Sequence, residues 1–347
     1  MRDFNLSVMS MTGDSSNRID AGGSSIGIEV AKPATRSGNK LVDSSLREGD
    51  LVGGKYRIER RLGIGGMGEV VAARHITIGA KVAIKILLSE MLQYPEVLQR
   101  FTREARAACA LQSDHVCRTT DVGELKNGAP YIVMELLGGM NLSEYIMHRG
   151  PMPEHVAIGF ALQALDAISE AHEHGIVHRD LKPVNLFLAR RGSCVVVKVL
   201  DFGIATSRNA TDDVRLTKTH ALLGTASYMS PEQIRAARAV DARSDVWAMG
   251  VTLYELVSGR LPFIGENALA IAYLIAAEPH PPLTNVSAQF AAIIDRSLAK
   301  DPGRRFQTAA EFAAALTRVE RLPVGSASCG CGSDQRGRDL DGATPVS

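Results

Sequence analysis

The chain has 347 residues, of which 45% are hydrophobic and 22% charged, a composition typical of a globular protein. This length is sufficient for two packed lobes of ordinary size. The formal net charge at pH 7 is only +1, so there is no electrostatic reason to expect a nucleic acid or an anionic membrane as a partner.

Membrane and disulfide-framework proteins are also disfavoured. The most apolar run, residues 246–257, contains Glu255 and is shorter than the ~18 residues that a spanning helix needs. The N-terminus has no apolar segment before a cleavage site, so we expect no signal peptide, no membrane anchor and a cytoplasmic location. Five cysteines are an odd number for disulfides, and Cys329 and Cys331 lie in a Gly- and Ser-rich stretch that favours free thiols over a soft-metal site.

The sequence divides into three zones. The first is rich in Ser, Gly, Asn and Thr without sustained periodicity, which predicts a disordered tail over residues 1–49. Patterned sequence follows over residues 50–321, and residues 322–347 are again predicted to be a disordered tail. Within the patterned zone we expect a small lobe at residues 50–135 and a larger one at residues 138–321.

The predicted elements change character along the patterned zone. The first part is rich in β-branched residues, with strands expected at residues 56–62, 70–74, 81–87 and 131–135 and one helix at 96–111. The second part is mainly helical, with helices expected at residues 157–174, 245–258, 268–277 and 288–298 and a strand pair at 186–189 and 195–200. This order predicts an α+β fold in which a cleft separates two unequal lobes.

The first motif is the run GIGGMG, in which Gly63, Gly65 and Gly68 have the GxGxxG spacing. Glycines allow the backbone to approach phosphates closely and to direct N–H groups at them. The same spacing occurs in dinucleotide-binding folds, where it opens a helix. Here residues 69–72 continue as a strand, which favours a hairpin that covers the phosphates of a nucleotide.

The strings HRDLKPVN and DFG supply the remaining groups for phosphoryl transfer from ATP. Asp180 is the expected base for an acceptor hydroxyl, and Lys182 can reach the γ-phosphate. The predicted hairpin between them returns Asp201 beside Asn185, so that two oxygen ligands meet. This pair suits Mg²⁺, or Mn²⁺, which takes its other ligands from water and ATP.

The run Val82-Ala83-Ile84-Lys85, with the three strings above, resembles the eukaryotic-like serine/threonine protein kinases of bacteria over roughly 270 residues. The resemblance implies a two-lobed kinase fold whose small sheet lobe carries one regulatory helix. It implies that Lys85 holds the α- and β-phosphates while Glu104 of that helix fixes the lysine. It also implies a set of nucleotide contacts: Leu62, Gly63, Ile64, Gly65, Gly66, Met67, Gly68, Val70, Ala83, Met134, Glu135, Leu137 and Phe187.

The same resemblance implies regulation and protein substrates. The segment after Asp201 is long and polar, and Thr217 and Thr219 lie where related bacterial kinases carry autophosphorylated threonines. Arg179, beside the expected base, would dock the phosphate, and transient self-association would allow phosphorylation in trans. Thr225 would instead shape the acceptor site. In the large lobe, the resemblance implies that Asp245 braces the catalytic loop and that Arg305 pairs with Glu232.

Three alternatives remain for the activity. A small-molecule phosphotransferase uses a similar cleft and a similar metal site, but it would lack the glycine loop and the string Ser230-Pro231-Glu232. A pseudokinase would lack one of Lys85, Asp180, Asn185 or Asp201, and all four are present. A real kinase that acts mainly as an adaptor through its tails is the third alternative.

Overall fold

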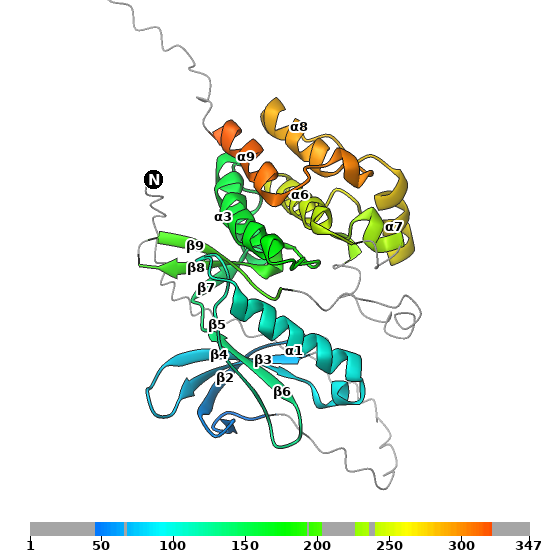
Figure 1. Cartoon of the computed structure of the whole chain (residues 1–347). Coiled ribbons are helices and arrows are strands. Elements are labelled where there is room, and N and C mark those ends of the chain that lie inside the picture. The colour runs from blue at the N-terminus through cyan, green and yellow to red at the C-terminus, as the bar shows by residue number, and fades with distance from the viewer. Residues whose placement is uncertain (1–45, 66–67, 193, 203–225, 236–239, 321–347) are drawn as a thin grey trace, which may run out of the picture.

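The computed structural model describes residues 46–65, 68–192, 194–202, 226–235 and 240–320. These residues form two lobes, an antiparallel sheet with one long helix and a mainly helical body, as Figure 1 shows. The predicted α+β class and two-lobed arrangement are therefore confirmed. The predicted boundaries at residues 49, 321 and 322 stay predictions. Among the described residues, no helix is both long and apolar enough to cross a bilayer.

The small lobe is built on a six-stranded sheet in the order β1-β2-β3-β4-β6-β5, and the pairs are antiparallel. Its strands are β1 (Leu51–Val52), β2 (Tyr56–Ile64), β3 (Gly68–His75), β4 (Lys81–Leu87), β5 (Thr119–Glu124) and β6 (Pro130–Glu135). The predicted strands were found within two residues at each end, whereas β1 and β5 were not predicted.

The alternation of side chains along β4 divides the sheet into two faces. Val82, Ile84 and Ile86 belong to a buried apolar cluster with residues of β1, β2, β3 and β6. Ala83 and Lys85, one residue out of phase, point to the opposite face. This period of two leaves the second face for the helix and for the cleft between the lobes.

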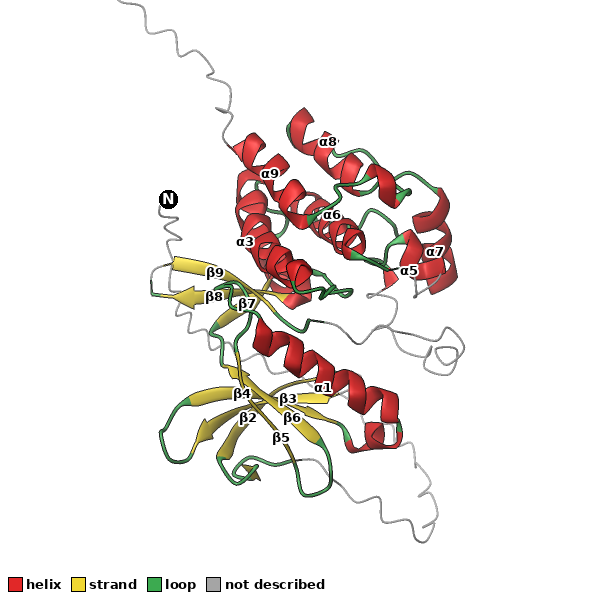
Figure 2. Cartoon of the chain, in the orientation of Figure 1, coloured by secondary structure: helices red, strands yellow, loops and turns green. Residues whose placement is uncertain are grey.

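The long helix α1 (Pro95–Ala110) follows a 3₁₀ turn, η1 (Ser89–Gln93), and lies between the sheet and the large lobe in Figures 1 and 2. A proline in its first turn is compatible with helix initiation because that N–H needs no intrahelical acceptor. Phe101 and Ala105 bury the inner face of α1 against Leu87 and Ile132 of the sheet.

The large lobe is centred on α6 (Ala242–Ser258), in which Trp247, Met249, Leu253 and Tyr254 are all fully buried. Around it lie α2 (Leu142–Arg149), α3 (Glu154–Glu173), α5 (Pro231–Arg235), α7 (Ala268–Ala277), α8 (Ala288–Ser297) and α9 (Ala309–Glu320). A small sheet of β7 (Gly139–Asn141), β8 (Leu186–Arg191) and β9 (Cys194–Val199) lies at the cleft end, next to η2 (Pro183–Asn185). The four predicted helices were found within three residues, whereas α2, α5, α9 and β7 were not predicted.

Candidate active site

The loop after α3 is fixed by one buried carboxylate of α6. Asp245 is 1% exposed and accepts the backbone N–H groups of His178 and Arg179 at 2.8 Å each. Its Oδ2 also lies 2.8 Å from Nε2 of His172 on α3. A buried carboxylate that accepts several hydrogen bonds keeps its donor groups in fixed positions, and here those donors include the backbone of the loop. The bracing expected of Asp245 is therefore present.

The backbone of this loop is left-handed at Arg179, with φ of 66°, a region that residues with a Cβ rarely adopt. Gln233 holds the turn because its Nε2 donates to the Arg179 carbonyl at 2.9 Å. The fully buried His178 supports it from the other side, since its Nδ1 accepts from the Asp180 N–H and its Nε2 donates to the Leu200 carbonyl. These contacts present Asp180 at the cleft.

Both carboxylate oxygens of Asp180 have partners from the same loop. Oδ1 lies 2.9 Å from Nζ of Lys182, and Oδ2 accepts from Nδ2 of Asn185 at 3.2 Å. The same Nδ2 donates to the Asp180 carbonyl at 2.7 Å. An oriented carboxylate beside an ammonium can accept a hydroxyl proton while the ammonium stabilises nearby negative charge.

The hairpin of β8 and β9 returns the chain beside this loop. Leu186 pairs with Val199, and the Leu200 N–H donates to the Asn185 carbonyl at 2.8 Å, so Asp201 follows directly. Since Nδ2 of Asn185 is a donor, its Oδ1 is the atom suited to a cation, and Asp201 offers carboxylate oxygens. This all-oxygen donor set fits Mg²⁺ or Mn²⁺.

Lys85 of β4 bridges the lobes, with Nζ 2.8 Å from Oδ1 of Asp201. Desolvation by itself would raise the pKa of Asp201, but the charge of Lys85 and its hydrogen bond hold that pKa below its usual range. The sequence predicted Glu104 as the partner of Lys85. The side chain of Glu104 lies outside the described part of the structure, so that ion pair stays a prediction.

The second face of the sheet borders the cleft. Val70 lies opposite Lys85, and Ala83 lies opposite Met134, so these four side chains share one face. Phe187, the predicted floor under adenine, is half-buried in β8 of the other lobe. A cavity of about 30 Å³ behind this face is lined by residues of both lobes, among them Lys85, Met134 and Asp201.

The glycine loop joins β2 and β3. The Gly65 N–H donates to the Gly68 carbonyl at 2.8 Å, which makes a tight turn. A Cβ at Gly68 would lie 2.6 Å from the backbone oxygen of Ile86, so the neighbouring strand requires glycine there. Of the other predicted loop residues, Gly63 is paired in β2, Leu62 and Ile64 are exposed, and Gly66 and Met67 lie outside the described residues.

Comparison with known proteins decides the family. Residues 56–315 match the model of the protein kinase domain. The chain belongs to the protein kinase family. Serine/threonine-protein kinase PknB of Mycobacterium leprae is 41% identical over 272 residues, which cover 76% of this chain and 43% of that protein. Pkn1 of Myxococcus xanthus is 42% identical over 270 residues, 76% of this chain and 38% of that one.

The chain thus spans less than half the length of these curated relatives. Among solved structures, the kinase domain of Mycobacterium tuberculosis PknI is 27% identical with a TM-score of 0.61, covering 79% of this chain and 99% of that one. The relatives confirm the resemblance to bacterial serine/threonine kinases that the motifs indicated.

The link between the lobes of this kinase begins at Glu135, and its side chain is held from the large lobe. Nζ of Lys198 in β9 lies 2.7 Å from Oε1 of Glu135, which also accepts the Arg118 N–H at 2.9 Å. Leu137, also predicted to contact the nucleotide, is half-buried in the same link. Sequence reasoning missed Lys198, although one charged residue inside the apolar run of β9 was a usable signal for a buried partner.

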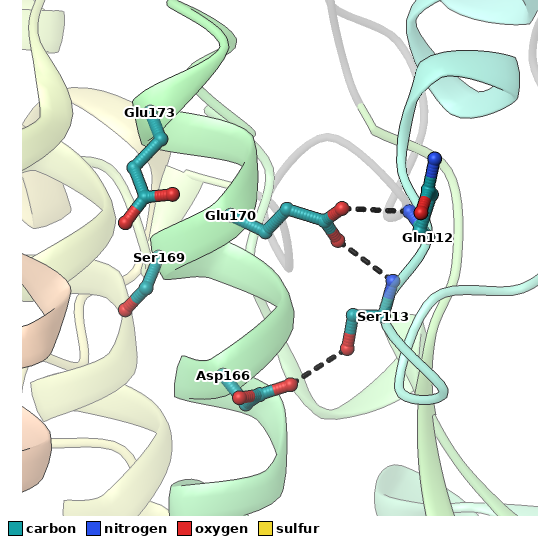
Figure 3. A pocket seen from close by; sticks show the side chains of 6 residues that line it. All are labelled: Gln112, Ser113, Asp166, Ser169, Glu170 and Glu173. Carbon is teal, nitrogen blue, oxygen red and sulfur yellow. Dashed lines mark hydrogen bonds between the residues drawn. The ribbon is translucent and has the colours of Figure 1, made fainter.

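A second connection between the lobes joins the end of α1 to α3 (Figure 3). Oε1 and Oε2 of Glu170 accept the backbone N–H groups of Gln112 and Ser113 at 2.7 and 2.8 Å. The Ser113 hydroxyl donates to Oδ2 of Asp166, one turn earlier on α3, at 2.7 Å. We call Glu170, Asp166, Gln112 and Ser113 the α1–α3 clamp. No sequence signal predicted this clamp, because Glu170 follows no periodic pattern in an Ala-rich helix.

The predicted regulatory residues are only partly visible. Thr217, Thr219 and Thr225 lie outside the described residues, so their roles stay predictions. Arg179 is half-buried, and among the described residues no side-chain bond is seen for its guanidinium, while its backbone groups are both used. Arg305 does pair with Glu232, at 2.8 and 2.9 Å, as expected.

Proposed function

We propose that this chain is a serine/threonine protein kinase that transfers the γ-phosphoryl group of ATP to hydroxyl groups of proteins. The observation that carries the proposal is Asp180, whose two oxygens are held by Lys182 and Asn185 directly beside Asp201. The matching family model and the serine/threonine kinase relatives support the same reaction class.

In this mechanism the acceptor hydroxyl oxygen forms a bond to the γ-phosphorus, and the bond from that phosphorus to the β–γ bridging oxygen breaks, so ADP leaves. Asp180 accepts the hydroxyl proton. Lys182 offsets charge on the γ-phosphoryl group, and Lys85 holds the α- and β-phosphates. A divalent cation at Asn185 and Asp201, Mg²⁺ or Mn²⁺, would neutralise phosphate charge when bound. The face of Val70, Ala83 and Met134 would cover adenine, with Phe187 below it.

The test compares the wild type with Asp180→Asn, using radiolabelled ATP, Mg²⁺ and a generic protein substrate. Loss of a positioned base should lower turnover by about 10²–10⁴-fold with ATP affinity nearly unchanged. Acid hydrolysis of the labelled product should yield phosphoserine or phosphothreonine. ATP binding without turnover in the wild type would indicate a pseudokinase, and near-normal turnover in the variant would remove Asp180 from the mechanism.

We also propose that Thr217, Thr219 or both are autophosphorylated in trans and that Arg179 receives the phosphate. A phosphate brings nearly two negative charges, and Arg179 directly precedes the base in the chain. Thr217→Ala with Thr219→Ala should lower activity at least several-fold, with ATP affinity nearly intact. Intact-mass spectrometry should find added phosphate on the wild type and not on Asp180→Asn. Equal masses after correction for the substitution, with full activity of the double variant, would exclude this regulation.

A further inference from the structure

Lys198 is a buried cation that the mechanism above does not use. It lies inside the apolar strand β9 and is 5% exposed. Its Nζ donates to Oε1 of Glu135 at 2.7 Å and to the Val116 carbonyl at 3.1 Å. Burying an ammonium is costly unless it is paired, so these two acceptors define where the lysine head can lie.

The position of Lys198 in the small sheet places it next to the predicted adenine floor. Lys198 lies directly opposite Phe187 in the pairing of β8 and β9, and cross-strand partners share a face. One cross-strand pair therefore contains both the residue proposed to lie under the base and a lysine that reaches the link between the lobes.

At the link, three hydrogen bonds hold the N–H group and the side chain of Glu135. Its N–H donates to the Arg118 carbonyl at 3.0 Å, and its Oε1 accepts the Arg118 N–H at 2.9 Å as well as Lys198. The two bonds with Arg118 come from the segment before β5. Of these partners only Lys198 lies in strand β9 of the floor pair. The segment before Arg118 bonds to the same strand through its backbone, since the Cys117 N–H donates to the Val199 carbonyl at 3.0 Å.

We infer that Lys198 is a positioning residue that sets the distance between the adenine floor and the link at Glu135. The inference rests on the proposed function and on the predicted contacts of Glu135, Leu137 and Phe187 with the nucleotide. Lys198 itself touches no part of the nucleotide. It acts through Glu135, so its removal should change recognition of the base and leave recognition of the phosphates intact.

The variant Lys198→Met keeps most of the side-chain length and removes the charge. The KM for ATP should rise about five- to tenfold, the effect of losing one ordinary hydrogen bond, because Lys198 acts only through Glu135, while kcat stays within about twofold. The inhibition constant of adenosine should rise by the same factor. That of magnesium tripolyphosphate, which has no base, should not change.

The matched control is Lys300→Met, which removes a second lysine of the large lobe, one that is half-buried. Nζ of Lys300 donates to the carbonyls of Leu274 and Ile275 and lies over the Phe263 ring, away from the link. This variant should lower the melting temperature without changing the KM for ATP. If Lys198→Met fails to fold, Glu135→Gln is the second variant, because it weakens the same contact without leaving a buried carboxylate. It should give the same selective loss of affinity for adenosine.

Equal losses for adenosine and tripolyphosphate would show that Lys198 is only structural and would overturn the inference. If the wild type phosphorylates protein but the KM for ATP and the inhibition constant of adenosine are unchanged in both Lys198→Met and Glu135→Gln, the inference is overturned too. A wild type that binds neither adenosine nor tripolyphosphate would instead contradict the proposed function itself.

Discussion

At the scale of single residues, Met134 is the residue predicted to limit how far a ligand reaches behind adenine. Its side chain shares the face of Ala83 and lines the cavity of about 30 Å³ near Lys85. Cys117, which lines the same cavity, is buried, and burial raises the pKa of its thiol to about 12, so it stays an uncharged, apolar wall. A ligand that passes Met134 therefore meets a small space with an uncharged wall at Cys117 and the charged groups of Lys85 and Asp201.

We predict that Met134→Gly opens this space to enlarged ligands. An ATP analogue with a bulky group on the exocyclic nitrogen should compete poorly with ATP in the wild type and at least tenfold better in the variant. Inhibition constants of the analogue and of unmodified ATP, measured on both forms, provide the test. Equal binding of the analogue to both forms would show that Met134 does not block the space behind the base.

Sequence reasoning located the residues whose chemistry is local to a motif. Asp180, Lys182 and Asn185 fall within one loop, and their mutual contacts follow from their spacing. The contact of Lys85 with Asp201 was not predicted, because it joins two motifs across the cleft and depends on how the lobes sit. Lys198 was missed for the same reason, since its acceptors come from distant segments that no periodicity connects.

At the scale of elements, the α1–α3 clamp fixes one end of the regulatory helix. Both N–H groups lie just beyond α1, where the chain leaves the helix, and both are accepted by Glu170. In Figure 3 the carboxylate of Glu170 spans the gap from α3 to this connection. The clamp therefore ties the C-terminal end of α1 to the large lobe through side chains of α3.

We predict that Glu170→Ala lowers kcat more than it raises the KM for ATP, because α1 carries Glu104, the predicted partner of Lys85. Two backbone donors lose a charged acceptor, which corresponds to about 1–3 kcal/mol in folding stability. The control is Glu173→Gln, which changes a carboxylate that lines, together with Glu170, the pocket drawn in Figure 3. Steady-state kinetics of the three forms decide it, and normal kcat in a folded Glu170→Ala protein would contradict the prediction.

Elements with a strong internal pattern were predicted well, and short or polar ones were not. The helix α7 was predicted with its exact bounds, since its sequence ALAIAYLIAA is apolar and bounded by Asn267 and Glu278. The strand β5 was missed because its sequence TTDVGE has no apolar alternation, and it exists as an edge strand paired with β6. For β1 and β7, pairing with a neighbour decides the structure, and residue preferences do not.

At the scale of the whole molecule, a buried ion pair connects the segments of the large lobe. Arg305 is 1% exposed and makes two bonds to Glu232 of α5, while further N–H groups donate to the carbonyls of Ala299, Lys300 and Arg243. Desolvation alone would raise the pKa of Glu232, but its bonds to Arg305 hold that pKa below its usual range. Its ionised form therefore stabilises the fold.

We predict that Glu232→Gln costs about 3–5 kcal/mol at pH 7, because an unpaired guanidinium stays buried. A lowered pKa in the folded state means that this contribution is complete above the unfolded value of about 4.3 and is lost as the pH falls through the folded value. The difference from the wild type should therefore shrink below about pH 4. Urea unfolding from pH 7 downward measures it.

The control for this prediction is Glu59→Gln, which removes an exposed ion pair with Arg74 on the small lobe. Such surface pairs contribute about 0–1 kcal/mol, so its unfolding free energy should stay close to that of the wild type. If Glu232→Gln is no more destabilised than Glu59→Gln, the buried pair does not hold the large lobe together.

The way in which α1 is attached has a consequence for switching. Its far end is fixed to α3, whereas its inner face rests on the sheet through a small cluster of Leu87, Phe101, Ala105 and Ile132. Each such side chain contributes only about 1.5–3 kcal/mol when fully buried. Because one end of α1 is fixed and its contact with the sheet is small, we expect the position in this structure to be in equilibrium with positions in which α1 has turned about that end. A nucleotide or a phosphate contact that favours that position by a few kcal/mol is enough to make it dominant.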